Sequence, residues 1–235
     1  MSIGLLQESA LHAALKRRHA NDHSEFEVAL DGYVIDLVQR TPNGGVARLI
    51  EIQTGNFAHM RDKLRDLVER YPVHLVHPIA VDTWIVMHGL HDEVVSRRKS
   101  PAHAGYSHVF SELMAFPDLI DHKNFTLEVV LTREDEWRVP LATPKKKRRW
   151  RAKTWRSIGR HLLEVLDWQV FECGADLLSL LPPELPAEFT VPQLTAAWLA
   201  PRWLAQRAVY CLLKCGAIAR VGKNGNAHVY AASPK

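Results

Sequence analysis

The sequence has little cysteine and no long apolar run. Its 235 residues include three cysteines, and two of them, Cys211 and Cys215, are four positions apart in an apolar helical pattern. Three cysteines do not make a disulfide framework, so we interpret this pair as core residues. No apolar stretch reaches the length of a membrane span, and the N-terminus lacks the order of a signal peptide. We therefore expect a cytoplasmic protein without a membrane partner.

Acidic residues are missing from one part of the chain. Between Arg138 and Leu163 there is no Asp or Glu, whereas ten Lys or Arg occur there. The formal net charge of the whole chain is only +4, so the remainder is net negative. This local basic character indicates contact with a polyanion or a linker. Trp150 and Trp155 interrupt the basic run and would add stacking on bases.

Two apolar segments between Tyr33 and Phe57 are predicted to form a β-hairpin. Asn43-Gly44 is a strong signal for a two-residue turn, and such a turn places Asp36 directly opposite Glu51. Like charges at opposed positions are destabilising, so a divalent cation between the two carboxylates is the simplest explanation. The alternative is a different turn and register, in which both acids are solvent-facing strand residues.

Further helices and strands are predicted around this hairpin, and their order favours a mixed α/β sheet. Near-continuous apolar runs after the hairpin indicate strands that are buried on both faces. A loop is expected at 96–106. The predicted elements are a helix Leu6–His19, a strand Glu25–Leu30, a helix 58–71, strands Val73–Ala80 and Thr83–His88, a helix His108–Phe116 and a strand Phe125–Leu131.

The C-terminal part is predicted to be a smaller helical domain. Apolar spacing favours a helix over Trp155–Phe171, and Thr190 is a plausible N-cap for the helix that follows it. A helix from Pro201 to Gly216 and a terminal hairpin complete the order of a winged helix-turn-helix. The predicted organisation is a domain at 1–140, a basic linker at 141–153 and a domain at 154–235. In the last domain, the residues expected to contact nucleic acid are Arg202, Gln206, Arg207 and Lys223.

A helix with an acid, a hairpin with Asp on its first strand and Glu-x-polar on its second, and a following helix resemble the PD-(D/E)xK nuclease superfamily. The resemblance covers roughly residues 1 to 135. It implies a restriction-endonuclease-like core in which Asp36, Glu51 and the Ile52 backbone carbonyl hold Mg²⁺ or Mn²⁺. It also implies that Glu8 supplies a further acid, although Glu8 could equally be a surface residue.

The chain departs from the superfamily at one position, because Gln53 stands where the family usually has lysine. That lysine helps to orient or activate the attacking water, so Gln53 would have to place the nucleophile here. Lys63, on the following predicted helix, is the best substitute for the missing lysine. An ordinary surface position for Lys63 is the alternative.

The resemblance implies a metal-dependent endonuclease that hydrolyses phosphodiester bonds, with DNA preferred to RNA as its partner. Three adjacent cations, Arg97, Arg98 and Lys99, would suit phosphate contacts, or they could form a solvated loop. Three alternatives stay open: a catalytically inactive DNA-binding regulator, an RNA-processing nuclease, and a scaffold for another enzyme. The sequence does not give the oligomeric state, and a homodimer is compatible with it.

Overall fold

The structure is a computed structural model that describes residues 10–89, 91, 93–147 and 150–234. Side chains are described for these residues except within 142–153. Short 3-10 helices occur at Phe57–Met60, Tyr106–Val109, Pro117–Asp121 and Asp176–Leu180. The other elements are α1 (Ala10–His19), β1 (Ser24–Leu30), β2 (Tyr33–Arg40), β3 (Val46–Ile52), α2 (Arg61–Val68), β4 (Val73–His88), β5 (Val94–Lys99), α3 (Phe110–Leu113), β6 (Phe125–Lys147), β7 (Trp150–Phe171), β8 (Glu188–Thr190), α4 (Val191–Trp198), α5 (Arg202–Lys214), β9 (Ile218–Asn224) and β10 (Ala227–Ala232).

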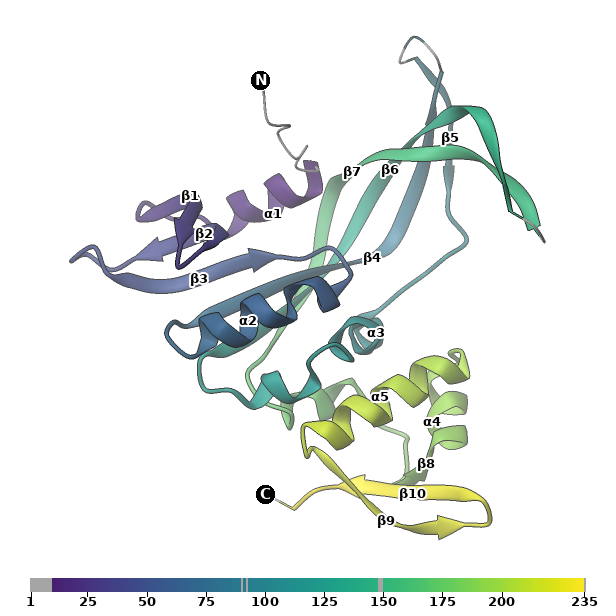
Figure 1. Ribbon diagram of the computed structural model, residues 1–235. Coiled ribbons are helices and arrows are strands. Elements are labelled where there is room, and N and C mark those ends of the chain that lie inside the picture. The colour runs from purple at the N-terminus through teal and green to yellow at the C-terminus, as the bar shows by residue number, and fades with distance from the viewer. Residues whose placement is uncertain (1–9, 90, 92, 148–149, 235) are drawn as a thin grey trace.

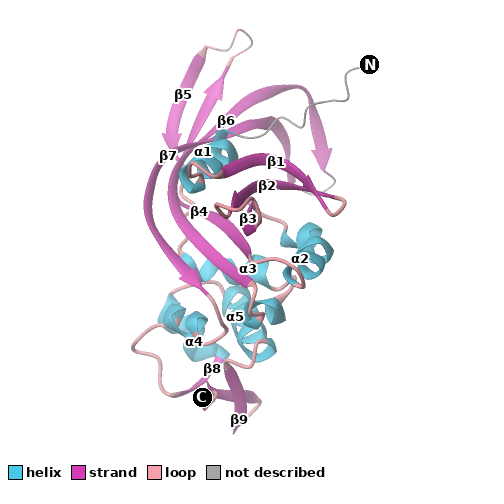
Figure 2. Ribbon diagram, turned by 90° about the vertical axis from the view of Figure 1, so that its left-hand side faces the viewer, coloured by secondary structure: helices cyan, strands magenta, loops and turns pink. Residues whose placement is uncertain are grey.

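A large mixed sheet organises the molecule, as the sequence predicted. Its strands follow the order β1-β2-β3-β4-β6-β7, and β5 pairs with the far end of β4. The β3–β4 and β4–β6 pairs are parallel, and the other pairs are antiparallel. In Figure 1 the long strands β4, β6 and β7 extend past the helices into an arm at the top, and Figure 2 shows β6 and β7 curving along the sheet.

Helices cover both faces of this sheet and form two separate cores. Side chains of successive strand residues point to opposite faces. On β3, Leu49 packs with Leu64 of α2, whereas Ile50 packs with Leu11 of α1. Glu51 follows in this alternation on the face of Leu49, which is the face that α2 covers. No helix in the described part of the chain is both long and apolar enough to cross a membrane.

The predicted register of the β2–β3 hairpin is observed. Leu37 pairs with Ile50 and Val38 with Leu49, so Asp36 and Glu51 occupy the next opposed positions. A two-residue turn at Asn43-Gly44 would produce the same register. The hairpin therefore brings the two acids together as the sequence indicated.

The turn itself differs from the prediction. The Gly44 N–H donates to the Thr41 carbonyl at 2.9 Å, and Gly44 has a φ of 81°. Asn43 is not in the left-handed region, so the connection is a longer loop with glycine at its left-handed position. A bulge between Gln39 and Arg40 then shifts the pairing by one residue, which restores the register of the shorter turn.

Three predictions about the middle of the chain were wrong. The segment Trp155–Phe171 is not a helix but part of strand β7, which pairs with β6 along its length. The expected linker and the boundary after residue 153 consequently fall within the β6–β7 hairpin. The strands expected at Val73–Ala80 and Thr83–His88 are one continuous strand, β4, with a bulge at 80–82.

The C-terminal elements form a three-stranded sheet with two helices. The strand order is β8-β10-β9, and both pairs are antiparallel. Thr190 caps α4 as predicted, because its hydroxyl accepts from the Gln193 N–H at 3.4 Å. Helix α5 lies beside α3 (Figure 1) and packs there with Phe110 and Leu113. These elements thus share one apolar core with the α2 face of the large sheet.

Candidate functional site

Asp36 lies where the β2–β3 ladder ends. Its Oδ2 accepts a hydrogen bond from the Ile52 N–H at 2.8 Å and lies 3.1 Å from Nε2 of His12 on α1. Burial favours the neutral carboxyl, but the His12 contact and the Ile52 N–H outweigh it, so the pKa of Asp36 lies below its usual value. Asp36 is therefore ionised at neutral pH.

The pKa of Glu51 is shifted in the opposite direction. Its side chain is 3% exposed, and its Oε1 lies 2.7 Å from the Lys63 ammonium. Burial raises the pKa of Glu51 to about 7, although the charge of Lys63 works against that rise. The neighbouring charge of Asp36 adds to it. The two adjacent carboxyl groups therefore differ in pKa, with that of Asp36 lowered and that of Glu51 raised.

Lys63 connects the acids to the neighbouring helix. From α2 its Nζ reaches Glu51 and also donates to the Val34 carbonyl on β2 at 2.7 Å. Lys63 also lowers the pKa of Asp36 through its charge. Its side chain is 18% exposed and that of Asp36 is 22% exposed. The site is therefore closed around Glu51 and reaches solvent at Asp36 and Lys63.

The other residues predicted for this site are placed differently. The side-chain amide of Gln53 donates to the carbonyls of Gly55 and Asn56 in its own loop, so it is held away from the paired acids. Ile52 offers its N–H to Asp36, and the role predicted for its carbonyl stays a prediction. Glu8 lies outside the described residues.

The sequence does not predict His12 as a residue of this site. The chain has thirteen histidines, and no spacing or motif distinguishes this one from the rest. Its position on α1 beside the end of β2 depends on how that helix packs on the sheet. Only the tertiary structure therefore shows that a histidine contacts Asp36.

The predicted cations Arg97, Arg98 and Lys99 are on strand β5 and not in a loop. Arg97 pairs with Asp135 at 2.9 Å, and Lys99 pairs with Asp82 at 2.7 Å. Arg98 is exposed and forms no ion pair among the described residues. Carboxylates on neighbouring strands thus compensate two of the three charges.

The C-terminal residues predicted to contact nucleic acid lie on α5 and β9. Arg202 and Gln206 are exposed and line a pocket beside β10. Arg207 stacks over Trp203 at 4.9 Å and lines a second pocket with Asn56 of the loop after β3. Lys223 is exposed near the end of β9. Arg207 is consequently the member of this group that faces the loop following Glu51.

Comparisons with known proteins give a family and a distant structural likeness. The family model described as "Domain of unknown function (DUF8091)" matches residues 9–172. A Treponema pallidum (strain Nichols) protein described as uncharacterized is 30% identical over 191 residues, which are 80% of this chain and 72% of that protein. The YaeQ protein from Xanthomonas axonopodis pv. citri has 10% identity and a TM-score of 0.33, over 68% of this chain and 83% of that one. Because the family model covers more than half of the sequence, the chain belongs to the DUF8091 family.

Proposed function

We propose that the protein is a metal-dependent phosphodiesterase that cleaves DNA, built on a restriction-endonuclease-like core. The observation that carries this proposal is the convergence of Asp36, Glu51 and Lys63 from β2, β3 and α2. The same elements in the same order underlie the resemblance to the PD-(D/E)xK nucleases.

The donor set at this point suits Mg²⁺ or Mn²⁺. Two carboxylates from adjacent strands are the ligands that Mg²⁺ uses in proteins, together with waters and phosphate oxygens. A raised pKa for one carboxyl beside an ionised one is typical of a site that gains a positive charge on loading. Asp36, Glu51 and the Ile52 carbonyl would hold the ion, and Glu8 would tune it. The bound ion would acidify a water and stabilise charge on the phosphate.

In this proposal, Lys63 does what the motif lysine does in the PD-(D/E)xK superfamily. Its ammonium reaches Glu51 and the Val34 carbonyl, so two acceptors on different strands fix its position. From there it would orient the attacking water and balance charge that develops on the phosphate. Gln53 would then fix the conformation of the loop that precedes α2, because its side-chain amide donates hydrogen bonds to carbonyls of that loop.

We propose that the C-terminal elements form a winged helix that holds DNA. The order β8, α4, α5, β9, β10 and a β8-β10-β9 sheet support this assignment. The exposed side chains of Arg202, Gln206 and Lys223 would contact the backbone or bases. Arg207 lies between this unit and the loop after Glu51, so it would link bound DNA to the metal site.

A catalytically inactive DNA-binding regulator is the second candidate. It is favoured by Gln53, whose amide is engaged by the loop carbonyls, and by the closed Glu51–Lys63 pair. An RNA-processing nuclease differs from the first candidate in its substrate only. All three readings need nucleic-acid binding, and they separate on cleavage and on the substrate cleaved.

The test is cleavage of labelled DNA and RNA panels with Mg²⁺ or Mn²⁺. The wild type should cut DNA, whereas Asp36→Asn, Glu51→Gln and Lys63→Met should lose at least about 100-fold in rate. Lys123→Met is the matched control, because Lys123 is exposed and distant in sequence from the site. Binding without cleavage by the wild type would favour the regulator, and cleavage of RNA alone would favour the processing enzyme.

A further inference from the structure

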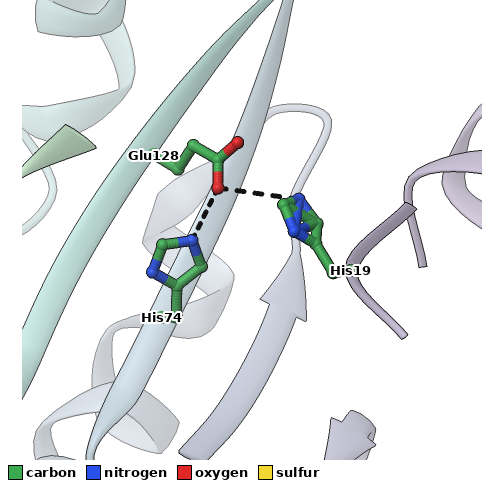
Figure 3. A group of neighbouring side chains, drawn as sticks. All are labelled: His19, His74 and Glu128. Carbon is green, nitrogen blue, oxygen red and sulfur yellow. Dashed lines mark hydrogen bonds and ion pairs between the residues drawn. The ribbon is translucent and has the colours of Figure 1, made fainter. Parts of the chain in front are cut away.

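A second group of titratable side chains lies on the α1 face of the sheet. His74 of β4 and Glu128 of β6 share this face with Val76 and Val130, and His19 is the last residue of α1. In Figure 3 both imidazole rings approach the same carboxylate oxygen. Nε2 of His74 is 2.7 Å from Oε2 of Glu128, and Nε2 of His19 is 3.6 Å from it.

The three ligand atoms are already close to the spacing of a metal site. They all lie within 4.8 Å of one another. Zinc–ligand bonds of roughly 2 Å separate the ligand atoms of a tetrahedral site by about 3.3 Å. The two distances from Glu128 fall on either side of that value, so adjustments of the side chains would accommodate an ion.

The surroundings hold the ligands of this cluster in place. The His19 side chain is also largely buried, with 11% of it exposed. Arg18 donates to the other oxygen of Glu128, Oε1, at 2.7 Å. Burial alone would favour neutral Glu128, but the His74 and Arg18 contacts lower its pKa. The carboxylate is thus fixed by Arg18, in the way that neighbouring residues orient metal ligands.

Among the described residues, Glu128 is the hydrogen-bond partner of His74. Its side chain is 7% exposed, and its Nδ1 makes no hydrogen bond with any described residue. The ring hydrogen-bonds through Nε2, the atom that faces Glu128, and it meets the His19 ring edge-on with the centroids 5.8 Å apart. Nε2 of His74 is thus the ring nitrogen placed to ligate an ion beside Glu128 and His19.

We propose that His19, His74 and Glu128 bind a divalent ion of the Zn²⁺ type, in a site separate from the one at Asp36 and Glu51. Two imidazoles and one carboxylate suit Zn²⁺, Fe²⁺ or Ni²⁺ and not Mg²⁺. Three protein ligands leave a further coordination position for water or a ligand. The alternative is an ion-pair network without metal, in which Arg18 and His74 neutralise Glu128 and fix the end of α1 to the sheet.

The first test uses the wild-type protein. After treatment with EDTA and exchange into excess Mg²⁺, it should bind one equivalent of Zn²⁺ in equilibrium dialysis. Co²⁺ in place of Zn²⁺ should give a visible ligand-field spectrum without a thiolate charge-transfer band, because the site contains no cysteine. Absence of tight Zn²⁺ binding, or a thiolate band, would overturn the proposal.

The second test uses single variants of the ligands. His19→Gln, His74→Gln and Glu128→Gln should each lose the equivalent of Zn²⁺, and Asp36→Asn should keep it. His103→Gln is the matched control, because His103 is exposed and contacts Asp82 instead. Circular dichroism in EDTA identifies any variant that fails to fold, and the conclusion then rests on the folded variants and the Co²⁺ spectrum. Unchanged Zn²⁺ stoichiometry in folded ligand variants would assign the cluster to the ion-pair network.

Discussion

Asp36 and Glu51 are both carboxyl groups, but their surroundings differ. Asp36 accepts hydrogen bonds from His12 and from a backbone N–H, whereas Glu51 is buried against apolar side chains beside one lysine. Their pKa values are consequently shifted in opposite directions. Neighbouring titratable groups with divergent pKa values are a feature of sites that handle protons or metal ions.

Glu51 should make stability depend on pH. Its pKa is about 7 when folded and near 4.5 when unfolded, so the folded state retains a proton between these values. Stability is therefore lost as pH rises through this window, and Glu51→Gln removes that loss. Relative to the wild type, Glu51→Gln should gain on the order of 2 kcal/mol between pH 5 and pH 8. Urea unfolding in EDTA at both pH values measures this, and parallel pH profiles would contradict it.

Lys63 should stabilise the protein mainly when Glu51 is charged. Replacing it with methionine leaves a buried carboxylate without its partner, which costs on the order of 3 kcal/mol. The cost should be greater at pH 8 than at pH 5.5, because protonation of Glu51 relieves it at the lower pH. Urea unfolding of Lys63→Met measures this, with Lys123→Met as the surface control. An equal loss at both pH values would show that the ion pair is not the cause.

Among individual site residues, the sequence predicted those whose position follows from strand pairing. Asp36 and Glu51 meet because a hairpin register determines which residues are opposed. The sequence predicts Lys63 as the substitute for the lysine of the PD-(D/E)xK superfamily, but its approach to Glu51 depends on how α2 packs on the sheet. His12 and the Glu128 cluster depend on contacts between distant segments, and no local pattern indicates those.

Among the elements, the β2–β3 hairpin depends on Gly44. Its φ of 81° lies in the left-handed region, which costs a residue with a Cβ about 1 kcal/mol. Gly44→Ala should therefore lower the free energy of unfolding by about that amount, as measured by urea unfolding. Gly222→Ala is the control, because Gly222 has ordinary φ and open space at its Cβ position. Equal effects of the two substitutions would contradict the role assigned to the turn.

The sequence of β7 predicted a helix because a β-bulge gives apolar residues the three-residue spacing that is typical of a helix. Leu162 and Val165 are three residues apart, yet both pack on the α1 face. Arg133 of β6 pairs with Glu164 and Glu134 pairs with Leu162, so Leu163 is an extra residue in β7 without an opposed partner. An apolar spacing of three therefore arises in a strand. Because a bulge depends on the partner strand, periodicity along β7 alone does not reveal it.

For the whole molecule, the described residues form a shared core between the large sheet and the C-terminal elements. Phe110 of α3 is fully buried, and its carbonyl contacts Cys211 of α5. Phe110→Ala should destabilise the protein by about 3–5 kcal/mol. Met114→Ala is the control for this substitution, because Met114 is exposed. The large sheet and the C-terminal elements of the wild type should unfold together in one calorimetric transition. Two separated transitions in the wild type would instead support independent domains.

Binding of a divalent ion by Asp36 and Glu51, as proposed above, is tested most directly by measuring Mn²⁺ binding. Electron paramagnetic resonance of free Mn²⁺ at pH 8 reports the number of Mn²⁺ ions bound. One equivalent of Zn²⁺ is added first to occupy the proposed site at His19, His74 and Glu128. The wild type and His74→Gln should each bind Mn²⁺, and affinity should fall as pH drops below about 7, where Glu51 takes up a proton. Asp36→Asn and Glu51→Gln should lose this binding. Equal Mn²⁺ binding by the wild type and by folded Asp36→Asn would contradict the account.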